Sequence, residues 1–243
     1  MEIEVVEMST LLRKKPDPNG GFKWMVDWEN VLDTPEDKEA YGLYQKRDKK
    51  YCDFRYVCDK QSTTLLLAFL RYDYKKALLR TRYLYIDRLR CNDYQIRGGD
   101  LDMAYFESLL LCFPTLEFLG RLLFSGVINW LPEDPKTKII LLKVLTQMGN
   151  GYKEHAERLV LLHRHALAHE LRPDGNWIYD LNTEDKYGSP RKSQPGDELH
   201  LNIPHFIDSS LLEIEKLCDQ LTGPQAQNMM ASFSQYISKR FPS

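Results

Sequence analysis

One stretch in the second half of the chain gathers side chains that can act on a phosphate ester. His163, Arg164, His165 and His169 lie within seven consecutive positions. An unperturbed imidazole titrates at about 6.5, so histidine can both accept and release a proton near neutral pH. The planar guanidinium of arginine matches two phosphate oxygens at once. These residue types suit acid–base catalysis on a bound phosphate.

An apolar helical pattern must position these groups. Leu159, Leu162 and Ala166 recur at helical spacing, and Pro173 ends the pattern because proline cannot continue a helix. At about 100° and about 1.5 Å per residue, His165 and His169 share a helix face, whereas Arg164 and His169 are about 140° and about 7.5 Å apart. Arg164 and His169 can therefore meet one ligand only if the helix frays between them, or if a second copy of the chain supplies one of them.

The segment from Arg164 to His169 resembles the Arg-x4–6-His signature of the HEPN superfamily, small helical domains found in many prokaryotic ribonucleases. The residue after the arginine is commonly asparagine in that family, and here it is His165. The resemblance implies a metal-independent endoribonuclease with its active site at a homodimer interface, such as a toxin or a defence or stress effector. It implies that Arg164 holds the scissile phosphate, that His169 performs acid–base chemistry, and that His165 orients or assists. His163 would support them.

Three other interpretations of these residues remain open. Imidazolium groups near the end of a helix can simply stabilise it through the helix dipole. His165 and His169 have the one-face spacing of zinc ligands, although Ala166 replaces the glutamate of a His-Glu-x-x-His motif. A HEPN-like module without activity could bind RNA, a nucleotide or a regulatory protein. We expect no metal and no cofactor.

Composition limits the location and the partners of the protein. The 243 residues are 43% apolar with a net charge of −2, so any RNA contact must come from a local patch. Five scattered cysteines favour reduced thiols and a cytoplasmic setting. No apolar stretch is long enough to span a bilayer, and the amino terminus lacks the apolar core of a signal peptide, so we expect no membrane association.

Two local patches could supply the positive charge. Residues 63–92 form the most basic stretch, which predicts either a solvated helix face packed through its aliphatic stems or a surface that follows phosphates between tyrosines. The polar segment 183–197 contains Lys186, Arg191 and Lys192, and Arg172 ends the motif helix. We expect these four residues to bind RNA beside the active site.

The periodicity predicts a mostly α protein built as an antiparallel helical bundle, and the resemblance implies that this bundle is HEPN-like. Residues 1–98 are expected to form an N-terminal extension, with either a hairpin near the turn at 16–21 or an irregular docked arm, followed by the basic helix. Residues 99–243 are expected to form the HEPN-like domain, with a small β-hairpin inserted at 176–203 after the motif helix. The helices expected in that domain cover about 100–126, 135–149, 152–171, 210–223 and 224–240.

Two residues in the expected helices lead to more specific structural predictions. Pro114 is expected to kink or divide its helix. Glu117 lies among apolar residues of the same helix, so its carboxylate needs solvent or a cationic partner. Arg164 is one such partner, and the pair would fix the guanidinium near the site.

Overall fold

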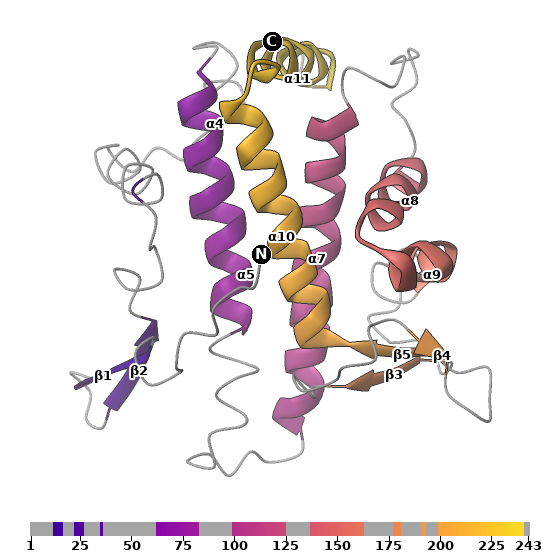
Figure 1. Cartoon of the computed structure of the whole chain (residues 1–243). Coiled ribbons are helices and arrows are strands. Elements are labelled where there is room, and N and C mark those ends of the chain that lie inside the picture. The colour runs from indigo at the N-terminus through magenta and orange to yellow at the C-terminus, as the bar shows by residue number, and fades with distance from the viewer. Residues whose placement is uncertain are drawn as a thin grey trace.

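The computed structural model is mostly helical (Figure 1). It describes residues 12–16, 22–26, 35, 62–82, 99–124, 137–162, 177–180, 191–192 and 199–240. The elements are β1 (Leu12–Pro16), β2 (Phe22–Val26), α4 (Thr63–Phe69), η2 (Leu70–Lys75), α5 (Lys76–Thr81), α7 (Gly99–Phe124), α8 (Thr137–Gln147), α9 (Asn150–Leu161), β3 (Trp177–Asp180), β4 (Arg191–Lys192), β5 (Leu199–Asn202), α10 (Ile203–Thr222) and α11 (Ala226–Arg240).

Three long helical segments form the body of the molecule. The segment α4–η2–α5 packs against both α7 and α10, and α11 packs across α4, α7 and α10 near one end (Figure 1). The middle part of the α4–η2–α5 segment, η2, is a π-helix. Ser62 is the N-cap of α4, and its hydroxyl accepts a 3.3 Å hydrogen bond from the Leu65 amide. Side chains from both sides of residue 98 therefore share one core.

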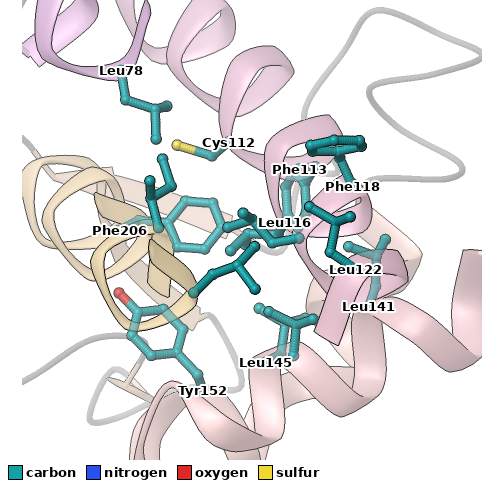
Figure 2. Close-up of a cluster of buried hydrophobic side chains, with 14 of the residues drawn as sticks. Leu78, Cys112, Phe113, Leu116, Phe118, Leu122, Leu141, Leu145, Tyr152 and Phe206 are labelled. Atoms are coloured by element: carbon teal, nitrogen blue, oxygen red, sulfur yellow. The ribbon is translucent and has the colours of Figure 1, made fainter. Parts of the chain in front are cut away.

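The core is built around α7. Phe113 and Leu116 are fully buried on α7 beside Phe206 of α10, with the Phe113 and Phe206 rings 5.3 Å apart (Figure 2). Gly120 permits the close approach of α8, because a Cβ there would lie 2.5 Å from Ile140 Cγ2 and 2.6 Å from Val144 Cγ2. Pro114 is exposed and does not divide the helix, which runs unbroken for 26 residues.

The α8–α9 pair confirms the turn predicted at Gly149. That glycine has φ 125°, a conformation that side chains with a Cβ rarely adopt, and it is the N-cap of α9. The predicted helix over 152–171 is confirmed through Leu161. Its remainder lies outside the described residues.

The predicted hairpin at 176–203 is wrong, although both of its strands exist. β3 pairs with β5 in parallel, with Trp177 opposite Leu199, and β4 pairs with β5 antiparallel on the other edge. Parallel strands need a long crossover, and residues 181–198 provide one. The alternating pattern correctly indicated strands, but it carries no information on pairing direction.

The helix predicted to begin at Ser210 begins earlier. Asn202 is the N-cap of α10, its Oδ1 accepts a 2.8 Å hydrogen bond from the His205 amide, and Pro204 occupies the first turn. Ser210 is fully buried inside the helix, and its hydroxyl donates a 2.8 Å hydrogen bond to the Phe206 carbonyl. An asparagine cap followed by proline was therefore the true start signal.

Of the two alternatives for the segment around the turn at 16–21, the structure shows the hairpin. β1 and β2 pair antiparallel, with Leu12 opposite Val26 and Pro16 opposite Phe22. Within the described part of the chain, no helix is long and apolar enough to cross a membrane.

Candidate functional site

Helix α9 leads directly into the predicted catalytic motif. Tyr152, Ala156, Leu159 and Val160 are buried, which anchors α9 in the core. The helix is intact at its C-cap, where the Leu162 amide donates hydrogen bonds to the carbonyls of Arg158 and Leu159. Arg164 is the second residue after this cap.

The predicted site residues divide into two groups. His163, Arg164, His165, His169, Arg172 and Lys186 lie outside the described residues. Arg191 and Lys192 form β4, whose register partners on β5 are His200 and Leu199. Their backbone therefore joins the small sheet, which continues into α10.

Glu117 finds its cation on its own helix. Its Oε1 accepts hydrogen bonds from Arg121 Nη2 at 2.5 Å and Nε at 3.1 Å, and another from the Thr137 hydroxyl at 2.9 Å. Arg121 is only 6% exposed, so this ion pair is largely shielded from solvent. The carboxylate thus links α7 to the first turn of α8, while the predicted Glu117–Arg164 pair involves a residue outside the described part of the chain.

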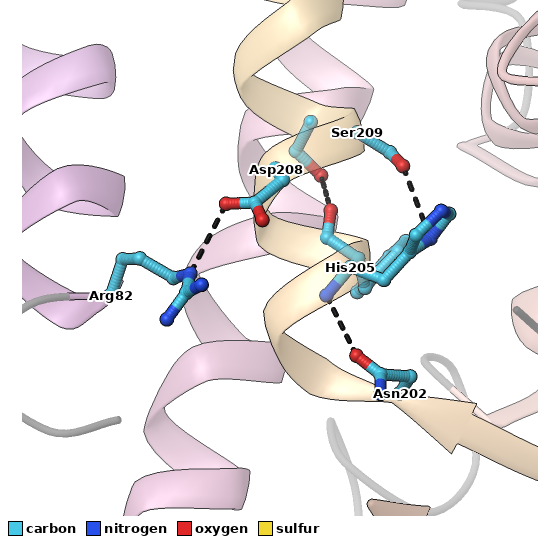
Figure 3. Close-up of polar contacts among 7 residues, drawn as sticks. Arg82, Asn202, His205, Asp208 and Ser209 are labelled. Atoms are coloured by element: carbon cyan, nitrogen blue, oxygen red, sulfur yellow. Dashed lines mark hydrogen bonds and ion pairs between the residues drawn. The ribbon is translucent and has the colours of Figure 1, made fainter. Parts of the chain in front are cut away.

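A polar cluster joins α9 to the first turn of α10. The Tyr152 hydroxyl lies 2.8 Å from His205 Nδ1, and the Tyr152 and His205 rings stack with their centroids 5.8 Å apart. The Ser209 hydroxyl lies 3.4 Å from the same nitrogen (Figure 3). A neutral His205 that accepts at Nδ1 carries its proton on Nε2. Tyr152 and Ser209 are buried, so the cluster satisfies polar groups in the core between the two helices.

Sequence reasoning missed this cluster because Tyr152 and His205 are 53 residues apart. The sequence did contain a local signal for half of this cluster, the N-cap at the start of α10. Recognising Asn202 as a cap would have placed His205 and Ser209 on one helical face, four residues apart.

The basic helix is held to α10 by carboxylates. Lys75 Nζ lies 2.7 Å from Glu215 Oε1, and Arg71 Nη2 lies 3.6 Å from Glu215 Oε2. Further along, Arg82 Nε lies 3.1 Å from Asp208 Oδ1 (Figure 3). Arg71 is 8% exposed. These three cations connect helices, which argues against a phosphate-binding role for them.

Cys112 is unsuited to nucleophilic chemistry. Its side chain is fully buried, and burial raises the pKa of the thiol to about 12, with a smaller opposing effect from the Ser210 hydroxyl. A thiol with that pKa stays protonated at neutral pH, whereas the thiolate is the reactive form. The described residues also contain no group of three or more His, Cys, Asp or Glu side chains placed to hold a metal ion.

An apolar groove of about 630 Å³ lies between the ends of α7, α8 and α10, lined by Phe124, Leu142, Lys143 and Gln220 among others. Among the described lining residues, Lys143 is the one that carries a charge, and its Nζ lies 5.3 Å from the centroid of the Phe124 ring. None of these described residues is an acid–base group that could act with that cation.

Comparisons of the chain with family models, with curated proteins and with solved structures gave no match.

Proposed function

We propose that the protein is a metal-independent endoribonuclease of the HEPN type that cuts single-stranded RNA. The observation that carries the proposal is the spacing of Arg164 and His169 directly after α9. The buried face of α9 anchors the helix that precedes this motif in the sequence, and a catalytic pair needs a rigid support.

The proposed reaction uses the RNA's own 2′-hydroxyl as the nucleophile. A base removes the 2′ proton, the oxygen attacks the adjacent phosphorus, the bond to the 5′ oxygen breaks, and an acid protonates that leaving oxygen. His169 acts in the proton transfers, and Arg164 neutralises the charge that develops on the phosphate. His165 orients His169 or assists it, and His163 supports the group.

The proposed site draws its residues from two protomers. On a continuous helix Arg164 and His169 would be about 140° apart, so a homodimer in which two motifs face each other would bring the pair together. An equimolar mixture of the Arg164→Ala and His169→Ala proteins tests this arrangement. Mixed dimers would contain one intact pair, so cleavage should return on mixing. Two inactive proteins that stay inactive after subunit exchange would exclude the two-protomer site.

The surroundings of the site agree with an RNA substrate. Arg172 precedes β3 in the sequence and Lys186, Arg191 and Lys192 follow it, and positive charge attracts a polyanion. We place the protein in the cytoplasm as a toxin or a defence or stress effector, where a protein or nucleotide regulator would control its activity.

Substitutions in the motif test the proposal. Arg164→Ala and His169→Ala should abolish cleavage of single-stranded RNA, and Arg164→Lys should be poorly tolerated because a point charge cannot replace the guanidinium fork. His165→Asn, which installs the residue commoner in the family, should keep much of the activity if His165 only orients its neighbours. His200→Gln is the matched control, because this half-buried histidine lies on β5 outside the motif. Folded protein that cuts no RNA would instead support a binding module.

A further inference from the structure

The β1–β2 hairpin concentrates positive charge in a chain that is slightly acidic overall. Its ten strand residues include Arg13, Lys14, Lys15 and Lys23 and no aspartate or glutamate. The connection between the strands adds one carboxylate, Asp17. The whole protein has a net charge of −2, so this excess is local to the hairpin.

The strand register divides the hairpin into two unlike faces. Alternate residues of a strand belong to opposite faces, and directly paired residues share a face. The register assigns Arg13, Lys15, Lys23 and Met25 to one face. The other face has Lys14 opposite Trp24 and Pro16 opposite Phe22. One face is therefore cationic, and the other is largely apolar and aromatic.

The pairing of Lys15 with Lys23 is unfavourable in isolation. Directly opposite residues of an antiparallel pair have Cβ atoms about 4.5–5.5 Å apart, and like charges there destabilise the ladder. A phosphate bound between two such lysines would turn repulsion into attraction. Arg71, Lys75 and Arg82 of the helical segment lie beside carboxylates of α10.

We propose that the β1–β2 hairpin binds single-stranded RNA, with Lys15, Lys23 and Arg13 contacting the phosphates. The identity of the polyanion rests on the proposed ribonuclease function. Phe22 and Trp24 share the opposite face with Lys14, so that face offers aromatic rings to bases and a cation to a phosphate, a combination that suits a nucleic acid better than an anionic membrane. The hairpin would hold the substrate strand while the motif cuts it.

The test measures binding without cleavage. The ligand is a fluorescent single-stranded 2′-O-methyl oligoribonucleotide, which lacks the nucleophile and stays intact. Each lost phosphate contact lowers the salt slope for single strands by about 0.7, so K15Q/K23Q should reduce the slope of log K against log salt by about 1.4 and weaken binding about tenfold near physiological salt. The matched control is K138Q/K153Q, which removes the same charge from two exposed helical positions and should bind like the unchanged protein.

Each outcome decides between the proposals. Equal slopes and equal Kd values for K15Q/K23Q and the control overturn the hairpin proposal, as does an unchanged protein that binds no oligonucleotide. Lysine-dependent sedimentation with phosphatidylserine vesicles, without oligonucleotide binding, would also overturn it in favour of a membrane. Hairpin-dependent binding by a protein that cuts no RNA would overturn only the ribonuclease. An unchanged thermal unfolding midpoint confirms that K15Q/K23Q is folded.

Discussion

The molecule has two strongly basic regions, which differ in the residues that lie opposite their cations. On the helical segment from Leu70 to Arg82, the described cations Arg71, Lys75 and Arg82 pair with Glu215 and Asp208 of α10. On the β1–β2 hairpin, the register places two lysines opposite each other and no carboxylate lies on either strand. The first region uses its charge to join helices, and the second is the region for which we propose polyanion binding.

The comparison teaches that a basic stretch cannot be assigned a function from its composition. The composition of residues 63–92 left two interpretations open, a solvated helix face and a surface that follows phosphates. The partners of these residues come from a helix about 130 residues later in the chain, and only the folded arrangement brings them close. Each region therefore predicts a distinct effect of mutation, on stability for the helix and on binding for the hairpin.

The largest of these effects on stability is expected from Glu215→Ala. It leaves Arg71 and Lys75 without this carboxylate while Arg71 stays buried, so we expect a loss of about 1–3 kcal/mol in the free energy of unfolding, less than for a fully buried pair because Glu215 is partly exposed. Urea denaturation measures it. Glu157→Ala, an exposed glutamate on α9, should stay within about 0.5 kcal/mol. Equal losses for both variants would show that the helical cations do not depend on α10.

A smaller effect is expected for the second helix-joining pair. A double-mutant cycle of Arg82→Gln and Asp208→Asn should give a coupling energy of about 0.2–1 kcal/mol, because the Asp208 side chain is 46% exposed and solvent weakens the attraction. Neither single variant should alter oligonucleotide binding. If the Arg82→Gln variant bound the oligonucleotide more weakly, part of this helical segment would belong to the RNA-binding surface.

The smallest change in stability is expected for the hairpin. K15Q/K23Q should leave the free energy of unfolding within about 0.5 kcal/mol or raise it slightly, since like charges are removed from opposite positions. Thermal unfolding followed by circular dichroism measures the change. A clear loss of stability would mean that these lysines have structural partners, as the helical cations do.

Local signals in the sequence were sufficient for several elements. The turn after Pro16 gave the β1–β2 hairpin, Gly149 separated α8 from α9, and the start near residue 100 and the end near 125 gave the extent of α7. Each of these depends on backbone preferences of neighbouring residues. The apolar periodicity likewise indicated a mostly helical protein.

The features that sequence reasoning missed depend on contacts between distant residues. The direction of the β3–β5 pair, the Tyr152–His205 contact and the Glu215 ion pairs join segments at least 18 residues apart along the chain. The early start of α10 is a different case, because its signal at Asn202 was present but was interpreted as the end of a strand. The catalytic motif itself remains a prediction from residue types and spacing.

Analysis of the cleavage products tests the central claim, that Arg164 and His169 cut RNA through its 2′-hydroxyl without a metal. Single-stranded RNA and DNA of the same sequence are incubated in excess chelator with the protein or its His169→Ala variant, and the product ends are determined by mass spectrometry. We predict 2′,3′-cyclic phosphate and 5′-hydroxyl ends from RNA, intact DNA, and a rate about 10²–10⁴-fold lower for His169→Ala. Cleavage of DNA, loss of activity in chelator, or a His169→Ala variant as fast as the unchanged protein would contradict the account.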